Sequence, residues 1–109
     1  MELSFIDAYT LWRRVPYPPK GSTRELRDIR ADLGEADEHA SVVNAFVRTG
    51  VFRPSGADVL AELDNVIARA DALCAEYSGS DLLAAREVHA YATLVAIVYQ
   101  GFLKAGQPD

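Results

Sequence analysis

Apolar side chains recur at every third or fourth position along two long stretches of this chain. The first stretch passes through Leu26, Ile29, Leu33, Ala36, Ala40, Val43 and Val47. The second passes through Val59, Leu63, Val66, Ala70, Leu73 and Tyr77. Residues with this spacing fall on one face of an α-helix, so both stretches are predicted to be core-facing helices of a bundle.

Capping and turn residues indicate where these two helices begin and end. Ser22 and Glu25 form a capping box, which predicts that the first helix begins there. Its apolar pattern stays in phase across Gly34, so we expect one unbroken helix to about residue 48, closed by Gly50. The second helix is expected to start at Ser55 and to end at residues 78–79.

The last third of the chain predicts a third long helix, capped by Ser80 or Asp81 and ending near Lys104. This helix has two apolar faces. One face consists of Val88, Tyr91, Val95, Val98 and Phe102, and the other of Ala90, Leu94, Ile97 and Gly101. Only one of them is needed to face a three-helix core, so the second requires another covering element.

A short helix is predicted near the N-terminus, from about Phe5 to Arg14, with Ser4 as its cap. Pro16, Pro18 and Pro19 follow it, and they cannot continue a helix because proline lacks the backbone N–H donor. The chain is therefore expected to pass through an extended connector before the first long helix.

These elements predict an all-α fold in a single domain, residues 1–109. The architecture is an up-and-down antiparallel helical bundle of three long helices plus a short N-terminal helix. Either that short helix or a second copy of the chain would cover the second face of the last helix. The second alternative predicts a homodimer, since two-fold dimers are the commonest oligomers.

Composition narrows the possible partners. The net charge is −5, which argues against nucleic acid as a partner, although basic residues gather between residues 13 and 30. The most apolar run, residues 90–99, is about half of the roughly twenty residues that a membrane span needs. No signal peptide is visible and Cys74 is the only cysteine, so we expect a cytoplasmic protein without internal disulfides.

The favoured function is therefore that of a small acidic interaction protein, which acts as a homodimer or binds another protein. No cofactor is expected, and no catalytic motif is present. The candidate interaction residues lie on the second face of the last helix and at the aromatic, proline-rich elbow. They are Ala90, Leu94, Ile97, Gly101, Trp12, Arg13 and Tyr17.

The alternative is a Mg²⁺-dependent enzyme using carboxylates of the first long helix. The candidate metal ligands are Asp28, Asp32, Glu35 and Glu38, since Mg²⁺ prefers oxygen ligands. One short fragment resembles the acidic motif of the all-helical nucleotide pyrophosphohydrolases. It departs from their pattern at Ala36, which stands where a second glutamate is expected, and the pair Glu25 and Asp28 lies upstream, in the wrong order.

One further resemblance lies at the N-terminus. The run Trp12-Arg13-Arg14-x-Pro16-Tyr17-Pro18, followed by Gly21-Ser22, resembles the opening of small all-helical proteins of high-GC bacteria. It covers about the first thirty residues. The resemblance implies a helical fold and brings no activity with it.

Overall fold

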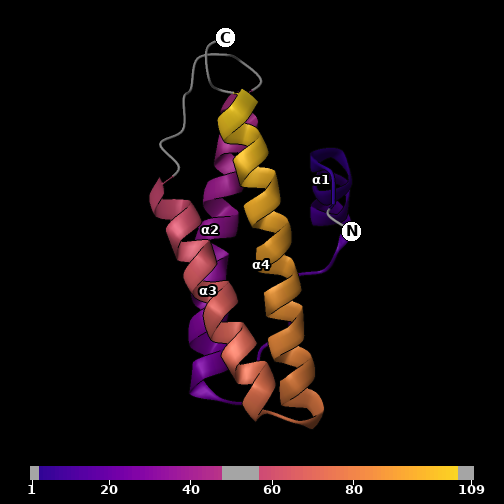
Figure 1. Ribbon diagram of the computed structural model, residues 1–109, viewed down its shortest axis with the longest axis vertical. Helices are drawn as coiled ribbons and strands as arrows, with labels where there is room; N and C mark the ends of the chain where they lie inside the picture. Colours follow the sequence, from indigo (N-terminus) through magenta and orange to yellow (C-terminus); the bar gives the residue numbers. More distant parts are fainter. Residues whose placement is uncertain (1–2, 48–56, 106–109) are drawn as a thin grey trace.

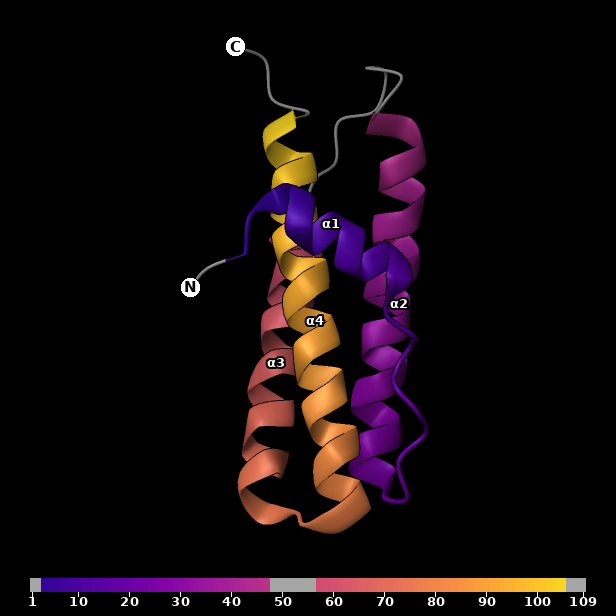
Figure 2. The ribbon, with the colours of Figure 1, turned by 90° about the vertical axis from the view of Figure 1, so that its right-hand side faces the viewer.

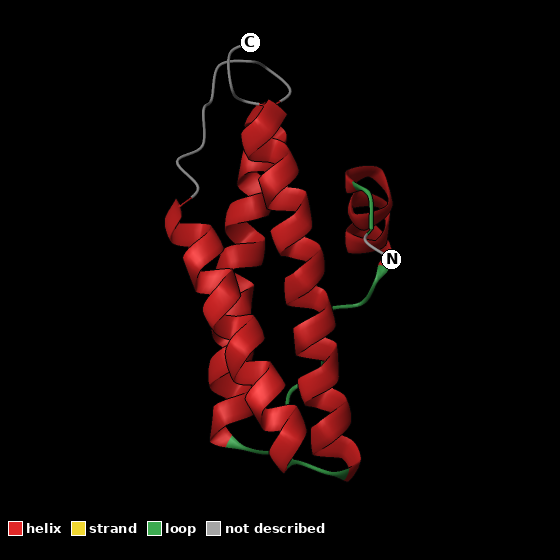
Figure 3. Ribbon diagram, in the orientation of Figure 1, coloured by secondary structure: helices red, strands yellow, loops and turns green. Residues whose placement is uncertain are grey.

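The computed structural model describes residues 3–47 and 57–105, and Figure 1 shows their arrangement. Four helices follow one another: α1 (Phe5–Arg14), α2 (Arg24–Val47), α3 (Ala57–Glu76) and α4 (Gly79–Ala105). The described residues include no β-strand (Figure 3). The all-α fold class predicted from the sequence is confirmed.

The three long helices lie side by side as a bundle. The chain runs along α2, returns along α3 and then follows the first direction again along α4 (Figures 1 and 2). This is the up-and-down arrangement that the apolar patterns predict. Gly34 does not interrupt α2, as expected.

The core follows the apolar patterns of the sequence. In α2 the buried residues are Leu26, Ile29, Leu33, Ala36, Ala40 and Val43. In α3 they are Leu63, Val66 and Ala70, while Val59, Leu73 and Tyr77 are partly buried against them. The first predicted face of α4, with Val88, Tyr91, Val95, Val98 and Phe102, is buried as well. The contact between the helices is thus mainly aliphatic packing, whose stabilisation scales with the apolar area removed from water.

The predicted start of α2 is wrong by one residue. Thr23 caps this helix, because its hydroxyl accepts the backbone N–H of Leu26 at 3.2 Å. The hydroxyl of Ser22 instead donates to the carboxylate of Asp81, near the start of α4. A partner 59 residues away along the chain therefore decides which of two adjacent hydroxyls caps the helix.

The turn between α3 and α4 is tighter than expected. α4 begins at Gly79, so the prediction that Ser80 or Asp81 caps it is wrong. Gly79 has a φ of 63°, a conformation that glycine adopts without steric cost, and the chain reverses within residues 77–79. The predicted C-cap at Gly50 and the predicted start at Ser55 lie outside the described residues.

The short helix α1 does not run parallel to the bundle. Ser4 caps it as predicted, with its hydroxyl accepting the backbone N–H of Asp7 at 3.2 Å. α1 crosses the C-terminal half of α4 and reaches over to α2 (Figure 2). It stands outside the layer formed by the three long helices, as the view in Figure 1 shows. α1 therefore covers part, but not all, of the outer side of α4.

Candidate functional site

An aromatic cluster fastens α1 to α4. The rings of Phe5, Tyr9 and Trp12 each lie within 5.9–6.4 Å of the Phe102 ring, measured between centroids. The tilts against Phe102 are between 67° and 76°, which is the edge-to-face geometry that aromatic pairs prefer. The spacing of these α1 residues puts all three rings on the side that faces α4.

Asp37 of α2 anchors α1 through polar contacts. The indole N–H of Trp12 donates to its Oδ1 at 2.6 Å, and the hydroxyl of Tyr91 donates to the same oxygen at 3.0 Å. One carboxylate thus joins α1, α2 and α4. Burial, and then the nearby negative charge of Asp37, raise the pKa of Tyr91 above its usual value near 10. A second tether lies further along α2, where the amide of Asn44 donates to the hydroxyl of Tyr9 at 3.2 Å.

The connector after α1 is fixed in place by Tyr17 and Arg30. The Tyr17 hydroxyl donates to the backbone carbonyl of Arg30 at 2.6 Å. A Cβ atom at Gly34 would come within 3.0 Å of that hydroxyl, so a glycine there lets the ring approach α2 closely. The Arg30 guanidinium lies 4.6 Å from the Tyr17 ring centroid and its Nε donates to the carbonyl of Pro18. Burial raises the pKa of Tyr17, although the positive charge of Arg30 opposes this shift.

Three of the predicted interaction residues lie at this docked elbow. Trp12 is buried and Tyr17 is half-buried, and the contacts of both are made within the chain. Arg13 is exposed, with its guanidinium 5.6 Å from the Trp12 ring centroid. Trp12 and Tyr17 therefore hold the fold together, and Arg13 is the one of the three whose side chain is exposed.

The other four predicted interaction residues lie on the outer side of α4, and α1 covers only some of them. Leu94 is only 8% exposed, and a Cβ atom at Gly101 would collide with the Phe5 ring. Ile97 is half-buried and Ala90 is exposed. Of the two elements predicted to cover this face, α1 covers the part around Leu94 and Gly101. The part around Ala90 stays open.

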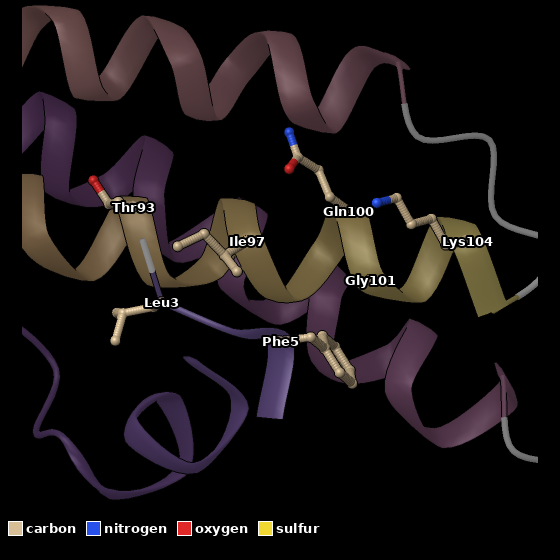
Figure 4. Close-up of a pocket in the computed structure, with 7 residues that line it drawn as sticks. All are labelled: Leu3, Phe5, Thr93, Ile97, Gln100, Gly101 and Lys104. Atoms are coloured by element: carbon tan, nitrogen blue, oxygen red, sulfur yellow. The ribbon is translucent and has the colours of Figure 1, made fainter. Parts of the chain in front are cut away.

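Two hollows flank α1, one at each end of the helix. The hollow at its N-terminal end has a volume of about 610 Å³, and Figure 4 shows the residues that line it. These are Leu3, Phe5, Thr93, Ile97, Gln100, Gly101 and Lys104. The hollow at its C-terminal end has a volume of about 160 Å³ and is lined by Val15, Pro16, Glu87, Ala90, Tyr91 and Leu94. The predicted face of α4 thus contributes to both hollows.

The candidate metal ligands of α2 do not converge. Asp32 pairs with Arg69 of α3 at 2.7 Å, and Asp28 lies 3.9 Å from Arg24, its neighbour one turn away. Glu35 lines a shallow groove between α2 and α3, and Glu38 is not among the residues that line it. Within the described ranges, no three His, Cys, Asp or Glu residues come close enough to share a metal ion.

Asp37 is a site residue that the apolar pattern of the sequence did not predict. Asp37 follows Leu33 by four positions and precedes Ala40 by three, so its side chain lies at the edge of the buried stripe of α2. A carboxylate at such a position signals a polar contact with another element. The missing information was the donor, since Trp12 and Tyr91 lie 25 and 54 residues away.

α4 also has the length and hydropathy of a membrane-spanning helix, which its short uninterrupted apolar run did not predict. Residues Gly79–Lys104 are long and apolar enough, by length and composition, to cross a membrane. The exclusion of a membrane span was too narrow because it considered only the uninterrupted apolar run. Half of the most apolar window is buried inside the bundle, and the core helix of a bundle can meet the same criteria of length and hydropathy.

Comparisons with known proteins add no relative to this description. No protein family, no curated protein and no solved structure matches the chain.

Proposed function

We propose that this chain is a small acidic interaction protein that acts as a homodimer. The proposed contact surface, here called the α1–α4 step, consists of Leu11, Arg14 and Val15 of α1 and the connector, together with Leu83, Glu87 and Ala90 of α4. A second copy of the chain is the proposed occupant. The observation that carries this proposal is the uncovered apolar half of α4 beside the protruding helix α1.

Three residues of the α1–α4 step are large apolar side chains that are exposed to solvent. Leu83 is 57% exposed, and Leu11 and Val15 are 42% and 40% exposed. Val15 lines the same hollow as Ala90, and Leu11 precedes Val15 by one helical turn, on the same side of α1. Exposed apolar side chains that gather on one side of a protein often mark interaction sites.

The apolar stripe on the outer side of α4 continues toward the N-terminus of this helix, beyond the region that α1 covers. Leu83, Glu87, Ala90, Leu94, Ile97 and Gly101 follow one another at alternating steps of four and three residues. Such a stripe is the packing face of a helix. α1 packs on its C-terminal part, and the N-terminal part, around Leu83 and Ala90, has the same periodicity but no helix in front of it (Figure 2).

The shape of this side favours a second copy as the occupant. α1 stands out from the bundle over one half of α4, and the other half is recessed (Figures 1 and 2). A two-fold axis perpendicular to α4 would place the α1 helix of each copy against the recessed half of the other. A helix is about 10 Å wide, and α4, with 27 residues at about 1.5 Å each, is long enough for two helices to cross it one beside the other.

The charges at the step are complementary under the same symmetry. Arg14 is exposed in the last turn of α1, and Glu87 is exposed in the recess. Neither side chain has an ion-pair partner within the part of the chain that the structure describes. In the proposed dimer, Arg14 of each copy approaches Glu87 of the other. A stable interface buries roughly 800 Å² per subunit, about a ninth of the 6905 Å² that one copy exposes.

Sedimentation velocity over a range of protein concentrations tests this proposal. The unmodified chain is expected to sediment as a dimer, and Leu83→Asp is expected to make it monomeric by placing an unpaired charge in the contact. Val42→Asp is the matched control, because Val42 is an exposed apolar residue of α2 that does not belong to the step. A monomer at every concentration, or equal weakening by both variants, would refute the dimer.

A charge exchange tests the orientation of the two copies. Arg14→Glu and Glu87→Arg are each expected to weaken the dimer, because each change places like charges opposite one another. The double variant restores the opposite charges and is expected to recover much of the association. Additive weakening in the double variant would exclude the proposed pairing.

A further inference from the structure

The hollow at the N-terminal end of α1 differs from the step in its chemistry. Figure 4 shows Leu3 and Phe5 on one side and the side chains of α4 on the other. Ile97 of α4 lines the same hollow as these two residues of the N-terminal segment. Gln100 and Lys104 project from the same side of α4, one turn apart (Figure 4). The hollow therefore has an apolar wall and a polar rim.

The polar rim carries donors and a positive charge. Lys104 is the only charged residue among the seven that line the hollow, although the whole chain has a net charge of −5. Lys104 is exposed and forms no ion pair among the described residues. The Gln100 side chain adds two N–H donors. The Thr93 hydroxyl already donates to the carbonyl of His89 at 2.8 Å, so it is left as an acceptor.

Phe5 gives the apolar wall its shape. Its ring lies directly on the backbone of α4 at Gly101, where any larger residue would collide with it. The same ring contacts Tyr9 and Phe102, which hold it in this position. The wall is therefore a fixed part of the α1 dock, the name used here for the packing of Phe5, Tyr9 and Trp12 on Phe102 together with the Trp12–Asp37 hydrogen bond.

We propose that this hollow binds a small monocarboxylate with a hydrocarbon tail. The carboxylate is received by Lys104 and Gln100, and the tail lies along Leu3, Phe5 and Ile97. A volume of about 610 Å³ is within the range of small-molecule sites. A cationic ligand would meet Lys104 as a like charge, and a ligand without a tail would leave the apolar wall in water. This site does not depend on the proposed dimer, since it shares none of the residues of the step.

Titration with octanoate, followed by backbone amide chemical shifts, tests the site. Octanoate is expected to cause saturable shifts at residues around Ile97 and Lys104, while octylamine and octanol cause no comparable shifts. Lys104→Gln is expected to weaken binding about tenfold, because a hydrogen bond to a charged group is lost. Arg86→Gln is the matched control: Arg86 is an exposed basic residue of α4, five turns away on the same side, and its loss should leave binding unchanged.

Two further variants separate binding in this hollow from binding at the step. Leu3→Ser removes part of the apolar wall at an exposed position, so it should weaken binding without unfolding the chain. Leu83→Asp should leave octanoate binding unchanged, whatever it does to the oligomeric state. Equal binding of octanol and octanoate, or unchanged binding in Lys104→Gln, would overturn the proposal.

Discussion

The α2–α4 bundle and the docked helix α1 are held by different kinds of contact. Within the bundle, Leu33, Leu63 and Val95 are fully buried, and the packing between the helices is mainly aliphatic. At the α1 dock, four aromatic rings meet, and the carboxylate of Asp37 accepts two hydrogen bonds. The bundle depends on many interchangeable apolar contacts, whereas the dock depends on a few specific ones.

This difference assigns different roles to the two regions. Aliphatic packing is tolerant of exchange at constant volume, and it stabilises the whole fold. Directional contacts fix one geometry, and they fail when a single donor or acceptor is removed. α1 shapes both the proposed dimer surface and the proposed ligand site. The dock therefore positions the two proposed surfaces, and the bundle supports the dock.

The largest expected effect comes from breaking the bundle. Leu63→Ala removes a fully buried side chain of α3 and should lower the free energy of unfolding by about 3 kcal/mol. Urea denaturation followed by far-UV circular dichroism measures this loss. Leu60→Ala, at a partly buried position of the same helix, is the control and should cost clearly less. Equal losses in the two variants would contradict the assigned core.

A smaller and more local effect is expected at the dock. Asp37→Ala leaves the N–H of Trp12 and the hydroxyl of Tyr91 without their acceptor, which should cost about 2 kcal/mol. Trp12 is the only tryptophan, so its fluorescence reports on α1 alone. We expect the emission to shift to the red while the helical signal of the bundle persists.

The neighbouring residue provides the control for this experiment. Glu38→Ala removes a carboxylate from the adjacent, exposed position and should leave the Trp12 emission unchanged. If Asp37→Ala unfolds α1 and the bundle together in one transition, the dock and the bundle form one cooperative unit and do not fail separately.

The same contrast explains how far the sequence predicts this molecule. The stripes of α2, α3 and α4 are periodic within each helix, so their buried faces follow from local spacing alone. The role of Asp37, the capping by Thr23 instead of Ser22, and the pairing of Asp32 with Arg69 each depend on a residue from another helix. The spacing of residues along one helix does not reveal which residues of another helix they will contact.

The candidate site was predictable only in part for the same reason. The second face of α4 is visible in the sequence as a repeated apolar stripe. Its division between α1 and open surface depends on the angle at which α1 crosses, and that angle rests on contacts with other helices, such as those of Trp12 with Phe102 and Asp37. Leu83 and Leu11 gain their proposed importance from that crossing.

Within the bundle, a substitution of Tyr99 is expected to raise the free energy of unfolding, whereas the substitutions above lower it. Its hydroxyl is fully buried and has no hydrogen-bond partner among the described residues. Burying such a group without a partner is unfavourable, so Tyr99→Phe should raise the free energy of unfolding by about 1 kcal/mol. Tyr91→Phe is the matched comparison, because its hydroxyl donates to Asp37, and it should lower stability instead. Stabilisation by both changes would show that the Tyr91 bond contributes nothing.

Alkaline pH provides the last test, and it too separates the dock from the bundle. Burial and the charge of Asp37 raise the pKa of Tyr91, so the folded chain keeps this proton at a pH where the unfolded chain loses it. The contribution is complete below about pH 10 and decreases as the pH rises above it, by at most about 1.4 kcal/mol per pH unit for one proton. Thermal unfolding from pH 9 to 11 should therefore show a steeper loss of stability for the unmodified chain than for Tyr91→Phe.

Tyr99 provides the control for this experiment. Burial alone raises the pKa of Tyr99, so Tyr99→Phe should flatten the profile of stability against pH less than Tyr91→Phe does. Identical profiles for the unmodified chain and Tyr91→Phe would show that Tyr91 ionises alike in the folded and unfolded chains, and that the Asp37 contact does not hold its proton.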